Sequence, residues 1–206
     1  MDRMWEKRMN QPADAQSAPL HQTRRGGLWP SVVFTIRQEA PADYATVYAL
    51  TKAAFLGTEH CDGDEQDMVE RLREKEGFIP ALSLVAEQNG QLVGHILFTP
   101  MTVGEHPALC LGPVSVLPEF QGQGIGSALI HAGHNAARRL GFFLCVLLGH
   151  ETYYPRFGYE QASTHGITIP IDAPDKCKMV MFLDEHGRCV RGEAVFPKEH
   201  LPGGLE

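Results

Sequence analysis

The residues best suited to chemistry form a glycine-rich turn between a strand-like segment and a helical one. Gly122, Gly124 and Gly126 alternate along this turn, which follows the apolar run 108–116 and precedes the amphipathic stretch 125–140. Glycines at alternate positions allow a tight turn in which successive N–H groups point into one concavity at a helix N-terminus. Such an arrangement binds phosphate oxygens. The turn therefore predicts a ligand that carries phosphate.

Two widespread phosphate-binding motifs do not fit this turn. The dinucleotide fingerprint GxGxxG would need glycine where Ser127 stands, and the region about 20 residues on, Phe142 to Leu148, offers no acidic residue for a ribose. A Walker loop requires a Gly-Lys pair, which the sequence lacks. A nucleotide-phosphate binder that uses the same loop in another way stays open as an alternative.

The turn has a different match. Gln121, Gly124 and Gly126 fit the pattern [Gln/Arg]-x-x-Gly-x-[Gly/Ala], and the chain resembles the GNAT N-acetyltransferase superfamily from about Phe34 to Phe196. In that family the turn holds the pyrophosphate of acetyl-CoA. The resemblance implies acetyl-CoA as cosubstrate, bound by a strand edge and by the turn: Val114, Ser115, Val116, Gln121, Gly122, Gln123, Gly124, Ile125, Gly126 and Ser127.

A second match lies downstream, after the apolar run 142–148. Tyr154 precedes the pair Gly158-Tyr159 by four residues, a spacing that is common in GNAT enzymes. The stretch 149–159 resembles most the YhbS-like branch of predicted bacterial acetyltransferases. The resemblance implies transfer of an acetyl group to a primary amine by direct attack in a ternary complex. The alternative is a non-catalytic acyl-CoA-binding or sensing module on the same scaffold.

The resemblance also suggests catalytic roles. Tyr154 is expected to be the general acid that protonates the departing thiolate, with adjacent Tyr153 as its rival. His150 is expected to be the general base, because an imidazole suits proton transfer near neutral pH. A histidine that only hydrogen-bonds its loop is the alternative. Weaker candidates for the base are Glu119, Glu151 and His95. No cysteine lies in an evident nucleophile setting, which disfavours a covalent acetyl-enzyme.

The sequence gives less information about the site that binds the acceptor amine. In GNAT proteins the loop between the first two helices commonly borders the acceptor site, so Glu59, His60 and Asp62 are expected to bind the amine, unless this is a plain polar loop. His131 and His134 lie three residues apart on the helix after the turn, but no third ligand is evident. We therefore expect a solvated helix face there and no metal.

The surrounding elements predict an α+β fold. We expect a mixed, mostly antiparallel central sheet with one parallel crossover and flanking helices. Helices are predicted after Pro41, after Asp64 and from Ile125 to Leu140. Asn89-Gly90 predicts a hairpin. Strands are expected at 32–38, 81–87, 91–103, 108–116, 142–148, 159–169 and 179–196, the last one broken near 185–187.

Composition and charge limit the possible partners, the domain organisation and the cellular compartment. The 206 residues carry 18 Lys+Arg and 25 Asp+Glu, a net charge of −7, which argues against nucleic acid and weakly favours a cationic amine. We expect a flexible tail over 1–31, one GNAT-like domain over 32–202, and a short tail over 203–206 that could be a vector scar. No segment is apolar enough for a membrane span. The odd number of cysteines, five, indicates a reducing, cytoplasmic compartment. The resemblance to GNAT proteins, which often dimerise, is also compatible with a homodimer.

Overall fold

A mixed sheet of nine strands forms the centre of this computed structural model, which describes residues 33–57 and 63–200. The strands are β1 (Thr35–Gln38), β2 (Ser83–Gln88), β3 (Gln91–Val103), β4 (His106–Val116), β5 (Leu144–Leu148), β6 (Glu160–Gln161), β7 (Ile167–Thr168), β8 (Lys178–Phe182) and β9 (Gly192–Val195). The α-helices in the described ranges are α2 (Tyr44–Phe55), α3 (Glu65–Glu74) and α4 (Ile125–Arg139). The predicted α+β class is thereby confirmed.

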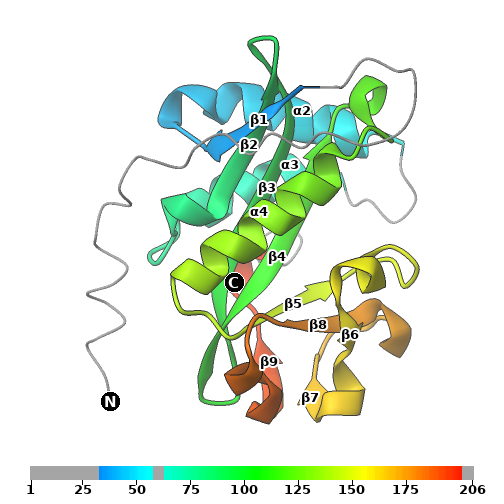
Figure 1. Cartoon of the computed structure of the whole chain (residues 1–206). Helices are drawn as coiled ribbons and strands as arrows, with labels where there is room; N and C mark the ends of the chain where they lie inside the picture. Colours follow the sequence, from blue (N-terminus) through cyan, green and yellow to red (C-terminus); the bar gives the residue numbers. More distant parts are fainter. Residues whose placement is uncertain (1–32, 58–62, 201–206) are drawn as a thin grey trace.

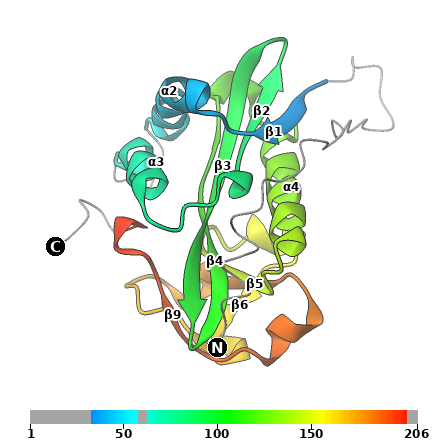
Figure 2. The same cartoon turned by 90° about the vertical axis from the view of Figure 1, so that its left-hand side faces the viewer.

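The helices cover the two faces of the sheet unequally. The main strand order is β1-β2-β3-β4-β5-β8-β6, and β9 pairs with β3 and with β7. Helix α4 lies on one face, and α2 and α3 lie together on the other (Figures 1 and 2). Within the described ranges, no helix has both the length and the hydropathy required to cross a membrane.

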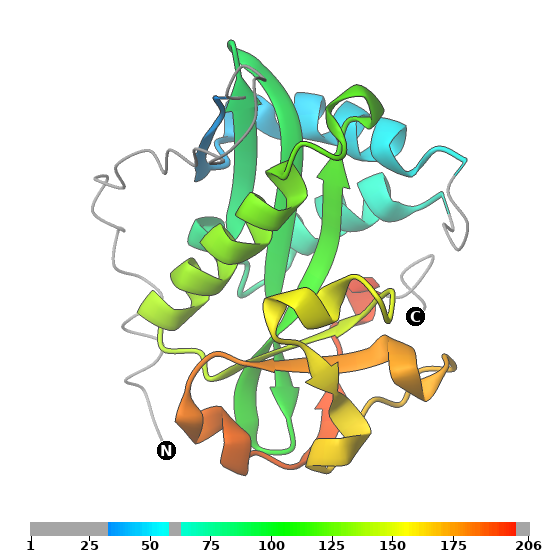
Figure 3. The same cartoon turned by 45° about the vertical axis from the view of Figure 1, so that its right-hand side comes forward.

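Strands β4 and β5 run parallel but soon part. Between these two described strands, pairing is limited to Leu109 with Cys145 and Cys110 with Val146. β4 then continues to Val116 along β3 while β5 diverges from it (Figure 3). A register shift against β3 marks the same place, because three steps on β4, from Leu111 to Val114, oppose two on β3. Bulges of this kind bend a strand, so the shift helps to turn β4 away from β5.

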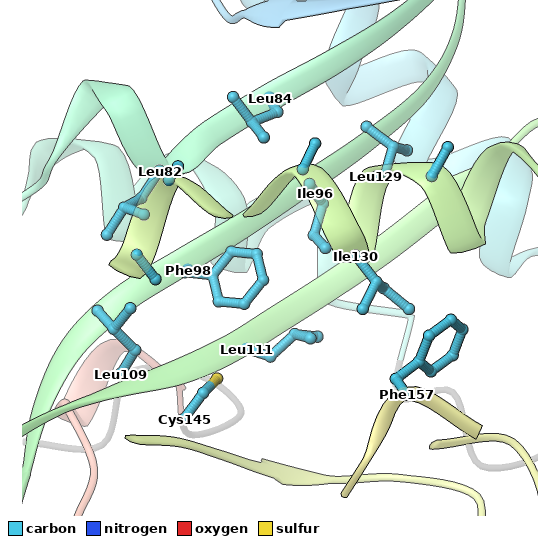
Figure 4. Packing of buried hydrophobic residues seen from close by; sticks show 14 of the residues in the cluster. Leu82, Leu84, Ile96, Phe98, Leu109, Leu111, Leu129, Ile130, Cys145 and Phe157 are labelled. Carbon is cyan, nitrogen blue, oxygen red and sulfur yellow. The ribbon is translucent and has the colours of Figure 1, made fainter. Parts of the chain in front are cut away.

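The largest core cluster lies between α4 and the sheet. Ile96 and Phe98 of β3 and Leu129 and Ile130 of α4 are all 0% exposed and point toward one another (Figure 4). Gly133 allows α4 to approach this closely, because a Cβ at this position would lie 2.1 Å from Cε2 of the Phe98 ring. Burial of these side chains holds α4, and hence the turn before it, in a definite position on the sheet.

Most predicted elements are present. The hairpin turn is confirmed, with φ of 52° at Asn89 and 79° at Gly90. The predicted helices are also found, and the strand predicted at 179–196 is interrupted as expected near 185–187, by the 3₁₀ turn Glu185–Cys189 between β8 and β9. The strand expected at 159–169 is wrong in part, since two-residue strands β6 and β7 flank a 3₁₀ turn there. The sheet also contains a second parallel pair, β7 with β9, besides the predicted crossover. The predicted tails, 1–31 and 203–206, lie outside the described residues.

Candidate functional site

The glycine-rich turn presents unpaired N–H groups at the start of α4. Gly122 and Gly124 have φ of 72° and 88°, a region that glycine adopts readily. In the described part of the chain, no backbone or side-chain acceptor takes a hydrogen bond from the N–H groups of residues 122–127. The Gln121 side chain instead braces the turn by donating to the Val116 carbonyl, at 3.0 Å. With the positive end of the helix dipole, these groups suit an anion.

The end of β4 leads into this turn with one edge open. Beyond Cys110, the edge of β4 that faces β5 pairs with no described strand. The Val114 and Val116 side chains lie against the first turn of α4, 3.9 and 3.6 Å from where a Cβ of Gly126 would stand. Ser115 points to the opposite face, where its hydroxyl is buried and donates to Thr51 Oγ1 at 3.3 Å. The predicted contacts of these three residues with a ligand would therefore involve backbone groups.

Tyr153 and Tyr154 occupy different places beside this edge. The Tyr153 hydroxyl lies 3.2 Å from the position of a Gly126 Cβ, directly against α4. The Tyr154 ring packs among aromatic rings, with centroid distances of 5.1 Å to Tyr153 and 5.6 Å to Tyr159. It also covers Gly149, where a Cβ would come within 2.2 Å of the ring. The sequence therefore needs glycine at 149 to seat Tyr154.

The surroundings of Tyr154 keep its hydroxyl protonated. Burial raises the pKa of Tyr154 above its ordinary value, and the neighbouring groups Tyr153, Cys145 and Cys110 raise it further. Cys110 and Cys145 belong to the paired residues of β4 and β5, so Tyr154 faces the place where the two strands part. A protonated hydroxyl at this place can donate a proton to an anion formed there.

The candidate bases are scattered. His150 is exposed just after β5, and its Nδ1 lies 3.1 Å from Thr152 Oγ1. Glu151 forms an ion pair with Lys176 at 2.6 Å. Glu119 is exposed in the 3₁₀ turn Pro118–Phe120, before the glycine-rich turn. His150 and Glu151 both lie in the loop that leaves the diverging strand β5, but the Glu151 carboxylate is engaged by Lys176.

His95 is a correction, because it cannot serve as the base. Its side chain is fully buried between β3 and the α2–α3 layer. The Ser83 hydroxyl donates to Glu39 at 2.6 Å, which leaves its oxygen to accept from His95 Nε2 at 3.0 Å. Arg73 completes this buried cluster by pairing with Glu39. Burial, followed by the nearby Arg73 charge, lowers the pKa of His95 to about 3.

The expected solvated helix face is right for His131 and wrong for His134. His131 is exposed, whereas His134 is 2% exposed and its Nε2 lies 3.0 Å from the Tyr159 hydroxyl. That hydroxyl donates in turn to Cys145 Sγ, at 3.4 Å. His134 thus fastens α4 to the aromatic segment that carries Tyr154. Among the residues described, no group of three His, Cys, Asp or Glu could hold a metal ion.

The burial of His134 gives the protein a dependence on pH. Burial first, then the charges of Arg138 and His131, lowers the pKa of His134 to about 4, from about 6.5 in the unfolded chain. The unfolded state therefore binds the proton first, and stability should fall as the pH drops from 6.5 toward 4. Between pH 7 and pH 5 this amounts to about 2 kcal/mol. Urea unfolding at both pH values should show a smaller difference for His134→Gln than for the parent protein; an equal difference would contradict it.

The expected acceptor residues and one unexpected residue complete the picture. Glu59, His60 and Asp62 lie outside the described residues. His200, which sequence reasoning missed, lies beneath the bulge of β4, with Nε2 2.5 Å from Thr99 Oγ1 and Cε1 3.8 Å from the position of a Gly112 Cβ. Burial first, then the charge of Lys75, lowers its pKa to about 4. It occupies the sheet face opposite α4, at the level where β4 and β5 part.

Comparison with known proteins gives these features a context. Residues 80–161, from the strand before the hairpin to the aromatic segment, match the acetyltransferase (GNAT) domain. The chain is 44% identical over 140 residues to the uncharacterized N-acetyltransferase YjhQ of Escherichia coli (strain K12), covering 61% of this chain and 77% of that protein. It is 30% identical over 134 residues to the uncharacterized N-acetyltransferase YhbS of the same strain, covering 64% of this chain and 77% of that protein.

Solved structures resemble the whole described fold. The structure of YhbS from Escherichia coli in complex with CoA has a TM-score of 0.75 at 26% identity and covers 84% of this chain and 95% of its own. A GNAT family acetyltransferase from Brucella melitensis in complex with acetyl-CoA has a TM-score of 0.68 at 33% identity, covering 82% and 98%. The glycine-rich turn and the aromatic segment from Tyr153 to Tyr159 both fall within the stretch that the domain match spans.

Proposed function

This chain belongs to the GNAT acetyltransferase family, in its YhbS-like branch, and from that premise we propose that it moves an acetyl group from acetyl-CoA to a primary amine by direct attack in a ternary complex. The observation that carries the proposal is the run of unpaired N–H groups over residues 122–127, at the end of a strand with an open edge. The CoA and acetyl-CoA complexes of two similar structures support it.

The turn and the strand edge suit the diphosphate and the pantetheine arm of the cosubstrate. The N–H groups of residues 122–127 would hold the diphosphate at the N-terminus of α4. The open edge at Val114–Val116 would pair with the amide groups of the pantetheine arm, as an added strand pairs with a sheet. Gly126 matters here because its missing side chain leaves the space beside the Tyr153 hydroxyl and the two valines free.

Acyl transfer to an amine then needs three further contributions from the chain. A backbone N–H near the open edge would polarise the thioester carbonyl, and one such donor is typically worth about 3–4 kcal/mol in a transition state. Tyr154 would donate a proton to the departing thiolate, since its hydroxyl is kept protonated. His150 would accept the proton that the amine loses, directly or through water.

The acceptor would enter beside the diverging strands. Glu59, His60 and Asp62 are proposed to bind it, because they stand in the sequence between α2 and α3, a segment that commonly borders the acceptor site in GNAT proteins. Their two carboxylates suit a cationic amine, as does the net charge of −7. A screen of amines with CoA release as readout would identify the acceptor. Binding of acetyl-CoA without CoA release for any amine would favour the non-catalytic module.

The turn itself can be tested with a matched pair of glycines. Gly124 and Gly90 both have strongly positive φ, 88° and 79°, and a Cβ on either would meet no atom within 4 Å. Gly124→Ala should strain the turn and misalign its N–H groups, and the loss of about one hydrogen bond to the charged diphosphate, worth about 1.5 kcal/mol, should raise the Kd of CoA about tenfold. Gly90→Ala imposes the same strain on the hairpin and should leave Kd unchanged.

Calorimetric titration of CoA into both variants measures this difference. Equal affinity in Gly124→Ala and Gly90→Ala would remove the turn from the binding site. Failure of the folded parent protein to bind CoA or acetyl-CoA would overturn the proposed function as a whole.

A further inference from the structure

Arg156 lies beside the proposed cosubstrate site, and its charge has no ion-pair partner among the described residues. Its guanidinium carbon stands 3.8 Å from the ring centroid of Tyr153 and 5.0 Å from that of Phe157. The side chain is exposed. Among the residues that the structure describes, no carboxylate lies within ion-pair distance of it. An arginine held in place by aromatic rings and lacking an acidic partner is well prepared to bind an anion.

The place of Tyr153 connects this charge to the start of α4. The hydroxyl end of Tyr153 lies against Gly126, in the first turn of the helix, while Arg156 covers the face of the same ring. The guanidinium is therefore one aromatic ring away from the N–H groups of residues 122–127. His131, one turn and a half along α4, packs edge-on against Phe157 at 5.4 Å and so supports the same aromatic cluster from the helix side.

Two phosphate-bearing parts of CoA could reach this region. The diphosphate already has six N–H donors and a helix dipole in the turn. The 3′-phosphate is carried by the ribose next to the diphosphate, so it would lie beside the turn, as Arg156 does across the Tyr153 ring. Since the chain carries a net charge of −7, a polyanion needs local cations to bind. A guanidinium can also form two parallel hydrogen bonds to one phosphate.

We propose that Arg156, held over Tyr153, binds the 3′-phosphate of CoA and makes the protein prefer CoA over 3′-dephospho-CoA. This inference rests on the proposed function, because it assigns a further contact to the same cosubstrate. It concerns binding of the donor and is independent of the acceptor amine.

Calorimetric titration with CoA and with 3′-dephospho-CoA tests the assignment. In Arg156→Met, which keeps an unbranched chain over the Tyr153 ring, the Kd of CoA should rise about tenfold, as for the loss of a charged hydrogen bond. The Kd of 3′-dephospho-CoA should change less than about twofold, so that the preference for CoA disappears. For Arg156→Lys, the Kd of CoA should lie between that of the parent protein and that of Arg156→Met, because lysine keeps the charge but loses the paired geometry.

Arg139→Met provides the matched control. Arg139 is also exposed, but it ends α4, about 20 Å from the turn for a helix of 15 residues. Its replacement removes the same charge and should leave both Kd values unchanged. If Arg156→Met weakens both ligands by the same factor, or neither, the assignment is wrong while the proposed function stands. If the parent protein binds neither ligand, the proposed function itself fails.

Discussion

Replacing Tyr154 by Phe should lower kcat at least a hundredfold with little change in the Kd of acetyl-CoA, because a positioned general acid typically contributes a factor of about 10²–10⁴. The phenylalanine ring would keep the packing against Gly149 and Tyr159, so the change removes a hydroxyl and little else. The measurement is steady-state CoA release with an amine found in the acceptor screen, alongside calorimetry for binding.

The physical case for this acid depends on the buried setting. In water a phenol, with a pKa of about 10, is a weaker acid than a thiol at about 8.5, so the proton transfer is uphill. Burial raises the pKa of Tyr154, but burial also destabilises a departing thiolate at the same place. The transfer moves the negative charge from the sulfur to the Tyr154 oxygen, so the buried phenolate must regain a proton from solvent before the next turnover.

Tyr153→Phe is the matched comparison. The Tyr153 hydroxyl lies against Gly126, so its loss should alter the affinity for acetyl-CoA more than kcat. The reverse result, with Tyr154→Phe fully active and Tyr153→Phe slow, would transfer the role of acid to Tyr153.

Replacing Gly133 by Ala should destabilise the fold by about 2–3 kcal/mol, as overpacking of a core does. The same substitution in an unhindered helix stabilises by about 1 kcal/mol, so the expected sign is reversed here. The cause is the Phe98 ring, three of whose carbons would lie 2.1, 2.6 and 3.0 Å from the new Cβ. Urea unfolding of the purified variant measures the effect.

A second substitution isolates that cause. Phe98→Leu should be costly alone but should recover part of the loss when combined with Gly133→Ala, since the smaller side chain makes room for the methyl group. The coupling in this double-mutant cycle is the decisive quantity. Additive losses, or a Gly133→Ala variant as stable as the parent, would show that α4 can move away from β3 at low cost.

The parts of the fold that could be read from the sequence are those determined by neighbouring residues. The Asn89-Gly90 hairpin depends on two adjacent backbone conformations. The glycine-rich turn depends on the local order of strand, glycines and amphipathic helix. The uninterrupted apolar run at 142–148 predicted a strand, and residues 144–147 of β5 are buried. In each case the cause lies within a few residues.

What the sequence could not provide depends on contacts between distant segments. His200 contacts Thr99, which lies 101 positions earlier in the chain, and no local sequence pattern predicts such a pair. The helical pattern predicts a solvated His134 because histidine counts as polar, yet the hydroxyl of Tyr159, 25 positions away, pairs with its ring inside the core. The two-residue strands β6 and β7 are too short to show any periodicity.

The open edge of β4 affects how readily one copy of the protein can pair with another. Unpaired backbone groups on a strand invite a neighbouring chain to pair with them and so to aggregate. Pro113, which has no N–H to donate, lies within the register shift of β4. As a proline in a bulge it interrupts the regular series of N–H donors along β4, so the irregularity that turns β4 away from β5 also makes the strand a poorer template for pairing with another copy.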